Sequence, residues 1–369
     1  MFSENHQFVL MLDSVEVSKN KILKFYKDFC HEDNLFLLFE NHSEIFKKYF
    51  SEKDIILIKN AILSKIWIKT AQKLQKQSIF CVFYDDDNYP QLLKNISNPP
   101  VVLYYIGDIK LFMEPCIAIV GSRTPTRYGK EVTEIFTRSL VRVGVVTVSG
   151  LAYGVDGLVA SSTLDEKGKT IAVLAGGLDN IYPSSHAELA RKIVKTGGLL
   201  VSEFLPGVKP QKHFFLERNR IIAGASIGML ITEAGEGSGT MSTARYAIDY
   251  GRELFVVPGN ITSDKSAGSN KLISEIPDCF TISPAEIIDR LGIADRIKIN
   301  DVNNKIKNLD TDEIAVIDAI GDDEVHFDDL VEMTKFHPQN LATLLTRMEI
   351  NGLIKKLSGN FYAVNKKII

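Results

Sequence analysis

The chain contains 369 residues, of which 45% are hydrophobic and 24% charged, and its formal net charge of −3 means that any nucleic-acid site has to be local. These fractions are typical of a globular protein with one large or two to three ordinary domains, and no apolar run approaches the ~20 residues that cross a bilayer. Scattered single cysteines argue against a zinc or redox pair, and the N-terminus lacks a signal-peptide pattern, so we expect a cytoplasmic protein.

Residues 1–75 are predicted to form a small helical, SAM-like module. Apolar residues recur at three- and four-residue spacing over 21–29 and 54–74, with lysines between them. From Ser78 the pattern changes to two strand-like runs, 79–84 and 99–106, separated by turn-forming residues. We interpret this change as the entry into an α/β domain that spans residues 78–292.

Short apolar runs then alternate with helical stretches through the α/β domain. Such runs predict an extended, Rossmann-like parallel sheet covered on both faces, with its ligand site at the carboxyl ends of the strands. The predicted strands are 117–120, 145–148, 170–174, 199–201, 228–232 and 254–257.

The C-terminal part is predicted to be a linker, 293–310, followed by a winged-helix-like module, 311–369. Helical patterns over 312–320, 327–334 and 338–351 precede a hairpin around Ser358-Gly359, with an acidic turn after the first helix. Residues 310–369 contain 6 Lys/Arg and 11 Asp/Glu, which is the wrong sign for phosphate contact. A protein-contact role is therefore at least as well supported as duplex binding.

One segment, 207–220, combines cations with aromatic residues in an otherwise acidic chain. Lysine and arginine bind phosphate oxygens, and an exposed ring offers a face on which any base can stack, so the combination suits a single strand. Two adjacent phenylalanines are equally compatible with a buried core. The residues concerned are Lys209, Lys212, Phe214, Phe215, Arg218 and Arg220.

Two glycine-containing loops are candidate phosphate sites. Gly121-Ser122-Arg123 follows a strand and precedes a helix, whose N-terminus, together with Arg123 and Arg127, would attract an anion. The simpler alternative is a tight turn with surface arginines. The second loop, Gly237-Ser238-Gly239-Thr240, also opens a helix, and a capped helix start explains it as well as a phosphate loop does.

The motifs of nucleotide-dependent enzymes are incomplete. The glycine spacing is not G-x-G-x-x-G, and the second strand ends in Ser149, where a dinucleotide site would have an acid. Gly168-Lys-Thr170 leads into a strand and lacks the first glycine of a P-loop. No active site is established by the remaining candidates, which are His186, Asp156, Asp179 and the pair of His213 and Glu217. We therefore expect no cofactor, metal or catalytic residue.

In combination, the motifs resemble the bacterial DNA-processing protein A family, also called Smf. The resemblance covers residues 82–289 as an ordered series, and the helical N-terminal module and winged-helix-like tail also fit it. The series is Ile119-Val-Gly-Ser-Arg123, Ser149-Gly-Leu-Ala-Tyr-Gly-Val-Asp156, Thr170-Ile-Ala-Val-Leu174, Gly177-Leu-Asp179, Tyr182-Pro183, Ser202-Glu203, Pro206-Gly207, Arg218-Asn-Arg-Ile-Ile-Ala-Gly224, Glu233-Ala234, Ser238-Gly239, Thr243-Ala244, Gly251-Arg252 and Val257-Pro-Gly259.

The resemblance implies a protein that binds single-stranded DNA, dimerises and helps load a RecA-type recombinase in natural transformation and recombination, without a chemical reaction. The family often has proline after the phenylalanine of its Phe-Pro-x-Arg-Asn-Arg segment, whereas Leu216 follows Phe215 here, so the sequence leaves open which phenylalanine stacks. The expected DNA- and phosphate-binding residues are Gly121, Ser122, Arg123, Lys212, Phe215, Arg218, Asn219, Arg220, Gly237, Ser238, Gly239 and Thr240.

Two other functions remain open at this point. A nucleotide-processing phosphoribohydrolase of the lysine-decarboxylase-like type shares a Gly-x-Gly-Thr loop, but Met241-Ser242-Thr243 occupies the positions where its catalytic glutamate should follow. Alternatively, the acidic C-terminal module is an adaptor that the α/β domain positions.

The sheet edge that joins segment 207–220 to both glycine loops is predicted to form one phosphate-binding groove.

Overall fold

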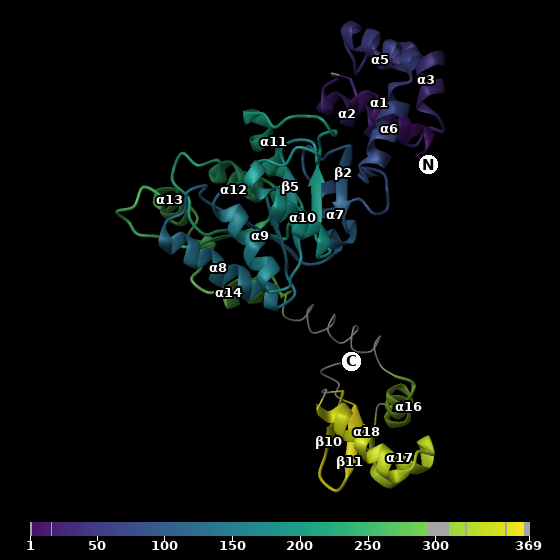
Figure 1. Ribbon diagram of the computed structural model, residues 1–369, viewed down its shortest axis with the longest axis vertical. Helices are drawn as coiled ribbons and strands as arrows, with labels where there is room; N and C mark the ends of the chain where they lie inside the picture. The colour runs from purple at the N-terminus through teal and green to yellow at the C-terminus, as the bar shows by residue number, and fades with distance from the viewer. Residues whose placement is uncertain (1, 16, 294–309, 322, 351–352, 365–369) are drawn as a thin grey trace. The chain divides into compact units, whose positions relative to one another are not determined.

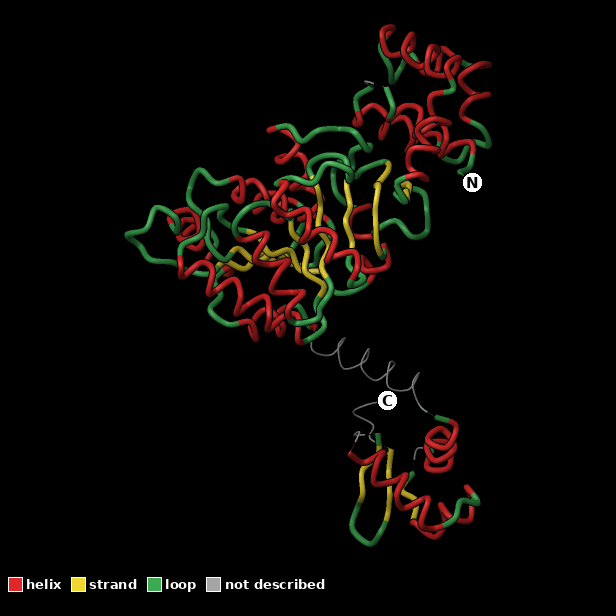
Figure 2. The backbone as a smooth tube through the Cα atoms, in the orientation of Figure 1, coloured by secondary structure: helices red, strands yellow, loops and turns green. Residues whose placement is uncertain are grey.

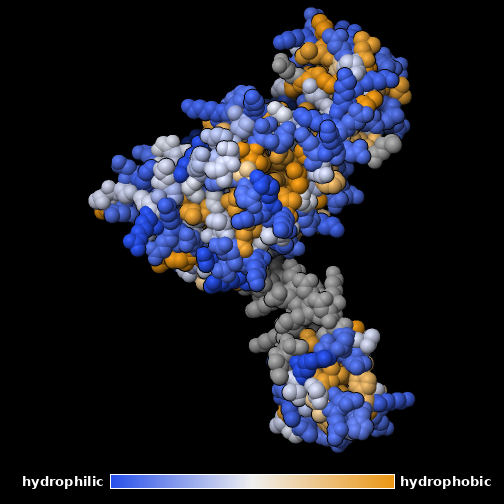
Figure 3. All heavy atoms as spheres, in the orientation of Figure 1, coloured by the Kyte–Doolittle hydropathy of each residue, from blue (hydrophilic) through white to orange (hydrophobic). Residues whose placement is uncertain are grey.

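A computed structural model describes residues 2–15, 17–293, 310–321, 323–350 and 353–364 (Figure 1). The chain forms two compact units, here called unit 1 (residues 1–291) and unit 2 (residues 292–369). Nearly all of the predicted linker, 293–310, lies outside the described residues. Within the described part of the chain no helix is long and apolar enough to cross a bilayer, and hydrophilic atoms cover much of the face shown in Figure 3.

Unit 1 begins with short helices. The helix predicted over 54–74 is in fact two helices, because Lys65 takes a left-handed conformation (φ 50°) that interrupts the helical hydrogen bonds. A capping box between Ser51 and Asp54 starts the first of the two. The helices are α1 (Glu4–Asp13), α2 (Lys19–Phe29), α3 (Leu35–Asn41), α4 (Ser43–Phe46), α5 (Glu52–Ser64) and α6 (Ile66–Lys76).

The sheet of unit 1 has eight strands in the order β1-β2-β6-β5-β4-β3-β7-β8. Strands β3 to β8 run parallel and confirm the six predicted strands to within one residue at each end, while β1 and β2 add an antiparallel edge. The strands are β1 (Phe80–Phe83), β2 (Val102–Gly107), β3 (Cys116–Val120), β4 (Val146–Ser149), β5 (Thr170–Leu174), β6 (Leu199–Ser202), β7 (Gly228–Ile231) and β8 (Glu253–Val256).

Helices cover both faces of this sheet, as the apolar runs predicted (Figure 2). Alternate residues of β5 point to opposite sides, since Ala172 and Leu174 join the core beneath α9 and α10, whereas Ile171 and Val173 join the core beneath α11 and α12. The helices are α7 (Gln91–Lys94), α8 (Arg127–Arg142), α9 (Val155–Asp165), α10 (Ala187–Lys195), α11 (Lys212–Gly224), α12 (Gly239–Asp249), α13 (Ala267–Glu275) and α14 (Pro284–Arg290).

The N-terminal helices share a core with one face of the sheet. Phe8 and Phe25 belong to the same buried cluster as Tyr104 and Leu200, and the Tyr104 hydroxyl donates to Asp13 at 2.6 Å. The domain boundary near residue 78 therefore stays a prediction, since no break in the core marks it.

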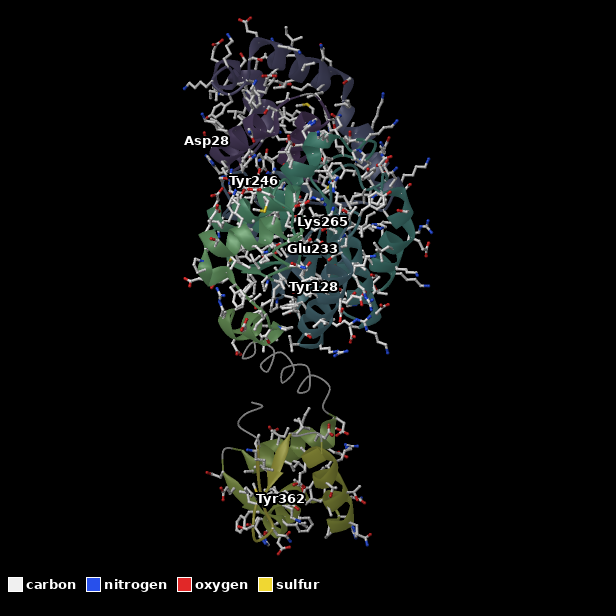
Figure 4. All side chains as sticks on the ribbon, turned by 90° about the vertical axis from the view of Figure 1, so that its left-hand side faces the viewer. Asp28, Tyr128, Glu233, Tyr246, Lys265 and Tyr362 are labelled. Atoms are coloured by element: carbon white, nitrogen blue, oxygen red, sulfur yellow. The ribbon has the colours of Figure 1, made fainter. Side chains whose placement is uncertain are left out.

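Unit 2 is the predicted winged helix, with one added strand. The expected acidic turn contains β9 (Glu324–His326), which pairs with β11 (Phe361–Val364), so the sheet has three strands in the order β10-β11-β9. Buried Leu330, Leu341 and Leu345 form its core with Tyr362, which is labelled in Figure 4. The remaining elements are α16 (Thr311–Ile320), α17 (Phe327–Thr334), α18 (Pro338–Ile350) and β10 (Ile354–Lys356).

A buried ion pair attaches α11 to the end of β6. The Arg220 guanidinium lies 2.6 Å from the Glu203 carboxylate, and the two side chains are 8% and 4% exposed. The Glu203 carbonyl in turn accepts a hydrogen bond from Lys19 at 2.5 Å, so the same residue contacts the N-terminal helices. A pair this deeply buried is stable only while both charges are present.

We predict that Glu203→Gln lowers the free energy of unfolding by about 3–5 kcal/mol, because it leaves the Arg220 charge buried without a counter-charge. The fluorescence of Trp67, the one tryptophan of the chain, reports the denaturant unfolding of unit 1. Glu188→Gln, which breaks an exposed ion pair with Arg191, is the control and should leave the midpoint nearly unchanged. An equal midpoint for both variants would contradict the structural role of the buried pair.

Candidate functional site

A cavity of about 1380 Å³ lies at the carboxyl edge of the sheet. The loops after β3 and β7 both line it, and these neighbouring strands mark the point where the strand order reverses along the chain. A crevice at such a point is the usual ligand site of an open parallel sheet. Helix α11 and the start of α13 complete its walls.

Helix α11 presents one stripe of side chains to the cavity. Lys212, Phe215, Asn219 and Ile222 follow each other at three- and four-residue spacing and all line it, which is the pattern of one helix face. The helix begins at Lys212, within segment 207–220. Leu216, which is 49% exposed, also lines the cavity from within the helix.

The two phenylalanines of α11 have different environments. The Phe214 ring packs against Phe204 with centroids 4.2 Å apart, away from the cavity lining. The Phe215 ring lines the cavity, and the Arg123 guanidinium lies over it at 5.2 Å in a cation–π contact. Phe215 is therefore the phenylalanine available to a ligand.

Two of the expected DNA-binding residues, Arg218 and Arg220, are buried. Arg218 and Arg220 are only 3% and 6% exposed, because their side of the helix packs on the sheet. Arg218 forms part of the cavity wall and donates to the carbonyls of Gly150, at 2.7 Å, and Val173. Burial lowers the pKa of Arg218 to about 10, so it stays charged at neutral pH. Arg220 does not line the cavity and is committed to Glu203.

Glycine is required at position 150 by this arrangement. A Cβ there would lie 2.2 Å from the Arg218 guanidinium. Asp156, beside it, accepts hydrogen bonds from the N–H groups of Gly150 at 3.0 Å and Ala152 at 3.4 Å. Burial raises the pKa of Asp156, and the nearby Arg218 charge opposes that shift. Asp156 therefore holds the loop between β4 and α9.

The anion site predicted at the start of α8 is filled by the protein itself. The Glu233 carboxylate, 2% exposed, accepts from the Thr126 N–H at 3.0 Å and from the Thr126 hydroxyl, directly at the helix N-terminus (Figure 4). Gly129 leaves it room, because a Cβ there would lie 2.5 Å from the carboxylate. Arg127 is exposed and outside the cavity lining, so only the Gly121-Ser-Arg123 part of this loop faces the cavity.

The second glycine loop has the features of both a capped helix start and a phosphate-binding loop. Ser238 caps α12 by accepting from the Thr240 N–H at 3.2 Å. The N–H groups of Gly237 and Gly239 have no acceptor among the described residues, and a Cβ on either would meet nothing within 4 Å. Neither glycine has a positive φ. Since neither packing nor backbone conformation requires glycine there, the bare backbone is left open to a ligand in the cavity.

Lys265 is a cavity residue that the sequence did not indicate. It precedes α13, lines the wall formed by the loop after β8, and donates to the Thr124 hydroxyl at 2.7 Å (Figure 4). Its isolated place in a polar loop gives no motif. Tyr182, which the sequence offered only as part of the family series, also lines the cavity.

The charge balance of the cavity is positive, although the chain is acidic. Arg123, Lys212, Arg218 and Lys265 line it, against Asp156, Glu236 and Asp264. Glu236 is paired with Lys271 at 2.5 Å, outside the lining residues. No cluster of His, Cys, Asp or Glu that could hold a metal ion occurs among the described residues. The cavity is thus equipped to bind anionic groups and a flat ring.

Family models match most of the chain. Residues 80–292 match the model described as DNA recombination-mediator protein A, and residues 304–360 match the DprA winged helix domain. Over 202 residues the chain is 42% identical to the DNA processing protein DprA of Bacillus subtilis, which covers 54% of this chain and 68% of that one. It is 33% identical over 287 residues to protein Smf of Escherichia coli, covering 76% of each.

Solved structures agree with these matches. The X-ray structure of DNA processing protein A from Streptococcus pneumoniae superposes with a TM-score of 0.67 at 30% identity, covering 78% of this chain and 98% of that one. A structure of the Helicobacter pylori protein, determined to describe its single-stranded DNA binding mode, gives a TM-score of 0.52 at 33% identity and covers 58% and 95%. The chain therefore belongs to the DNA recombination-mediator protein A (DprA/Smf) family and carries that family's winged-helix domain.

Proposed function

We propose that this recombination mediator binds single-stranded DNA in the cavity of unit 1, protects it and helps load a RecA-type recombinase onto it, in natural transformation and homologous recombination. It acts in the cytoplasm as a homodimer and catalyses no reaction. The recombinase and the dimer rest on family membership, whereas the DNA site rests on the geometry of the cavity.

The observation that carries the DNA site is the contact of Phe215 with Arg123 beside Lys212. A cation and a partly exposed ring that lie 5.2 Å apart offer a phosphate and its base adjacent binding partners. The N–H groups of Gly237 and Gly239, which have no acceptor in the part of the chain that the structure describes, add donors for phosphate oxygens across the cavity. Stacking on a ring requires an unpaired base, so these partners favour a single strand over a duplex. The Helicobacter pylori relative, described as binding single-stranded DNA, supports the same ligand.

The cavity offers less support to the phosphoribohydrolase alternative. Met241-Ser242-Thr243 forms the first turn of α12, where that class of enzyme needs its glutamate, and Asp156 is engaged with two backbone N–H groups. Release of free base from nucleoside monophosphates, abolished by Asp156→Asn, would overturn the proposed function.

We predict that Arg123→Gln and Lys212→Gln each flatten the slope of log affinity for oligothymidine against log salt by about 0.7, because each removes one phosphate contact. Fluorescence anisotropy over a salt series measures the slope. Arg127→Gln is the matched control, since Arg127 is exposed at the first position of α8, close to Arg123 in the chain, but lies outside the cavity. Slopes that change equally in all three variants would contradict binding of the strand in the cavity.

Removal of unit 2 should leave DNA binding unchanged. Arg347 of α18 is engaged with Asp310 at 2.6 Å and Glu313 at 3.1 Å, so the helix offers no free cation to a phosphate. A chain ending at residue 291 should therefore keep the oligothymidine affinity and salt slope of the full chain. If recombinase loading is lost while binding survives, unit 2 is an adaptor; a flattened slope would instead make unit 2 part of the DNA site.

Gly239→Ala should separate stability from binding. Gly239 is the first residue of α12 and has space for a methyl group, so alanine is expected to stabilise the protein by about 0.4–1 kcal/mol. A phosphate bound at this N–H would meet the added methyl group on the adjacent Cα, so we expect affinity for oligothymidine to fall about tenfold. Thermal unfolding and anisotropy measure the two effects; unchanged affinity would exclude this N–H from the site.

A further inference from the structure

Two tyrosines continue the aromatic surface that Phe215 begins. The ring centroids of Tyr182 and Phe215 are 5.4 Å apart, and those of Tyr153 and Tyr182 are 6.4 Å apart. Tyr182 lines the mouth of the cavity, whereas Tyr153 lies beyond its lining residues. We call Phe215, Tyr182 and Tyr153 the aromatic row. The row leads out of the cavity along the loops that follow β5 and β4, which are neighbours in the sheet.

The geometry of the aromatic row leaves ring faces uncovered. The two ring pairs meet edge to face, with interplanar angles of 68° and 75°, and each tyrosine is 48% exposed. Face-to-face stacking covers one face of both rings, whereas an edge-to-face pair covers a face of only one of them and leaves more of the surface on which a base binds. The row is thus arranged as a set of separate platforms.

The loop that carries Tyr153 is held in a costly conformation. Leu151 has a left-handed backbone (φ 54°) with a fully buried side chain, although this region disfavours leucine. His186 bonds the Leu151 carbonyl through Nδ1 at 3.0 Å and supports the Tyr153 ring at 5.7 Å. Gly157 makes space for that imidazole, since a Cβ would lie 2.7 Å from it. The loop buries its leucine and directs its tyrosine to solvent.

We propose that Tyr182 and Tyr153 bind successive bases of the strand whose phosphates lie in the cavity, so that the strand leaves the cavity along the aromatic row. This inference rests on the proposed function, because it extends the path of the same strand. The proposal assigns the contact to the tyrosine rings and not to their hydroxyl groups, so the rings bind the bases and leave the phosphates to the cavity. Every base has a π face, and the row therefore accepts any sequence.

The test compares two ligands with the same phosphates. Fluorescence anisotropy measures the affinity for two ligands, an oligothymidine and an abasic deoxyribose-phosphate strand of equal length. The proteins compared are the full chain and its variants Tyr153→Ala and Tyr182→Ala. Each alanine variant should lose about 5- to 100-fold in affinity for oligothymidine, with an unchanged salt slope. Affinity for the abasic strand should not change. Tyr153→Phe and Tyr182→Phe should retain wild-type affinity, since the ring remains.

Phe80→Ala is the matched control, because Phe80 is an aromatic residue 57% exposed on the edge strand β1, outside the cavity lining. It should alter neither affinity. An equal loss on both strands in the tyrosine variants would show that the loops had moved and would overturn the proposal, as would unchanged affinity for oligothymidine. Failure of the proposed function has a different signature, since the wild-type chain would then bind neither strand in a salt-dependent manner.

Discussion

The position of α11 depends on two buried guanidinium groups, and the cavity depends on α11. Arg220 is paired with Glu203, and Arg218 donates to carbonyls of the loop after β4 and of β5. The helix is therefore attached to the sheet at both charges, with Phe215 about one turn and Lys212 about two turns nearer its start than Arg218. The segment before it is held from the other side, because Lys19 and Lys73 of the N-terminal helices donate to the carbonyls of Glu203 and Pro206. The N-terminal helices thus help to position α11 without lining the cavity.

The region around the cavity is positive because nearby carboxylates are paired with other groups of the protein. Glu233 is neutralised by the N-terminus of α8, Glu236 by Lys271, and Asp156 by backbone N–H groups and the nearby Arg218. The cations Arg123 and Lys212, by contrast, remain exposed. Net charge is consequently a poor guide to the ligand of this protein, because the sign at the cavity is set by which carboxylates are already paired.

The order of elements followed from sequence, whereas the environment of single residues did not. Apolar runs such as 170–174 identified the parallel strands because a strand buried on both faces has few alternatives. The loops at residues 121–123 and 237–240 were identified as cavity walls because glycine loops between a strand and a helix converge at one sheet edge. The burial of Arg218 and Arg220, and the capping of α8 by Glu233, depend on contacts between residues 17 to 107 positions apart, which local patterns do not encode. Lys265 was missed for the same reason.

Leu216 has a consequence for the energetics of binding. A proline at this position, inside α11, would lack the N–H that the helix needs and would disfavour helical geometry at Phe215. With leucine, the first turn of the helix is regular, and Lys212 and Phe215 are fixed on one face before any ligand arrives. Ordering a flexible backbone costs about 1–2 kcal/mol per residue, and that cost is met during folding rather than during binding. The segment is therefore preorganised, and more of the free energy of each contact with a ligand of the cavity is expressed as affinity.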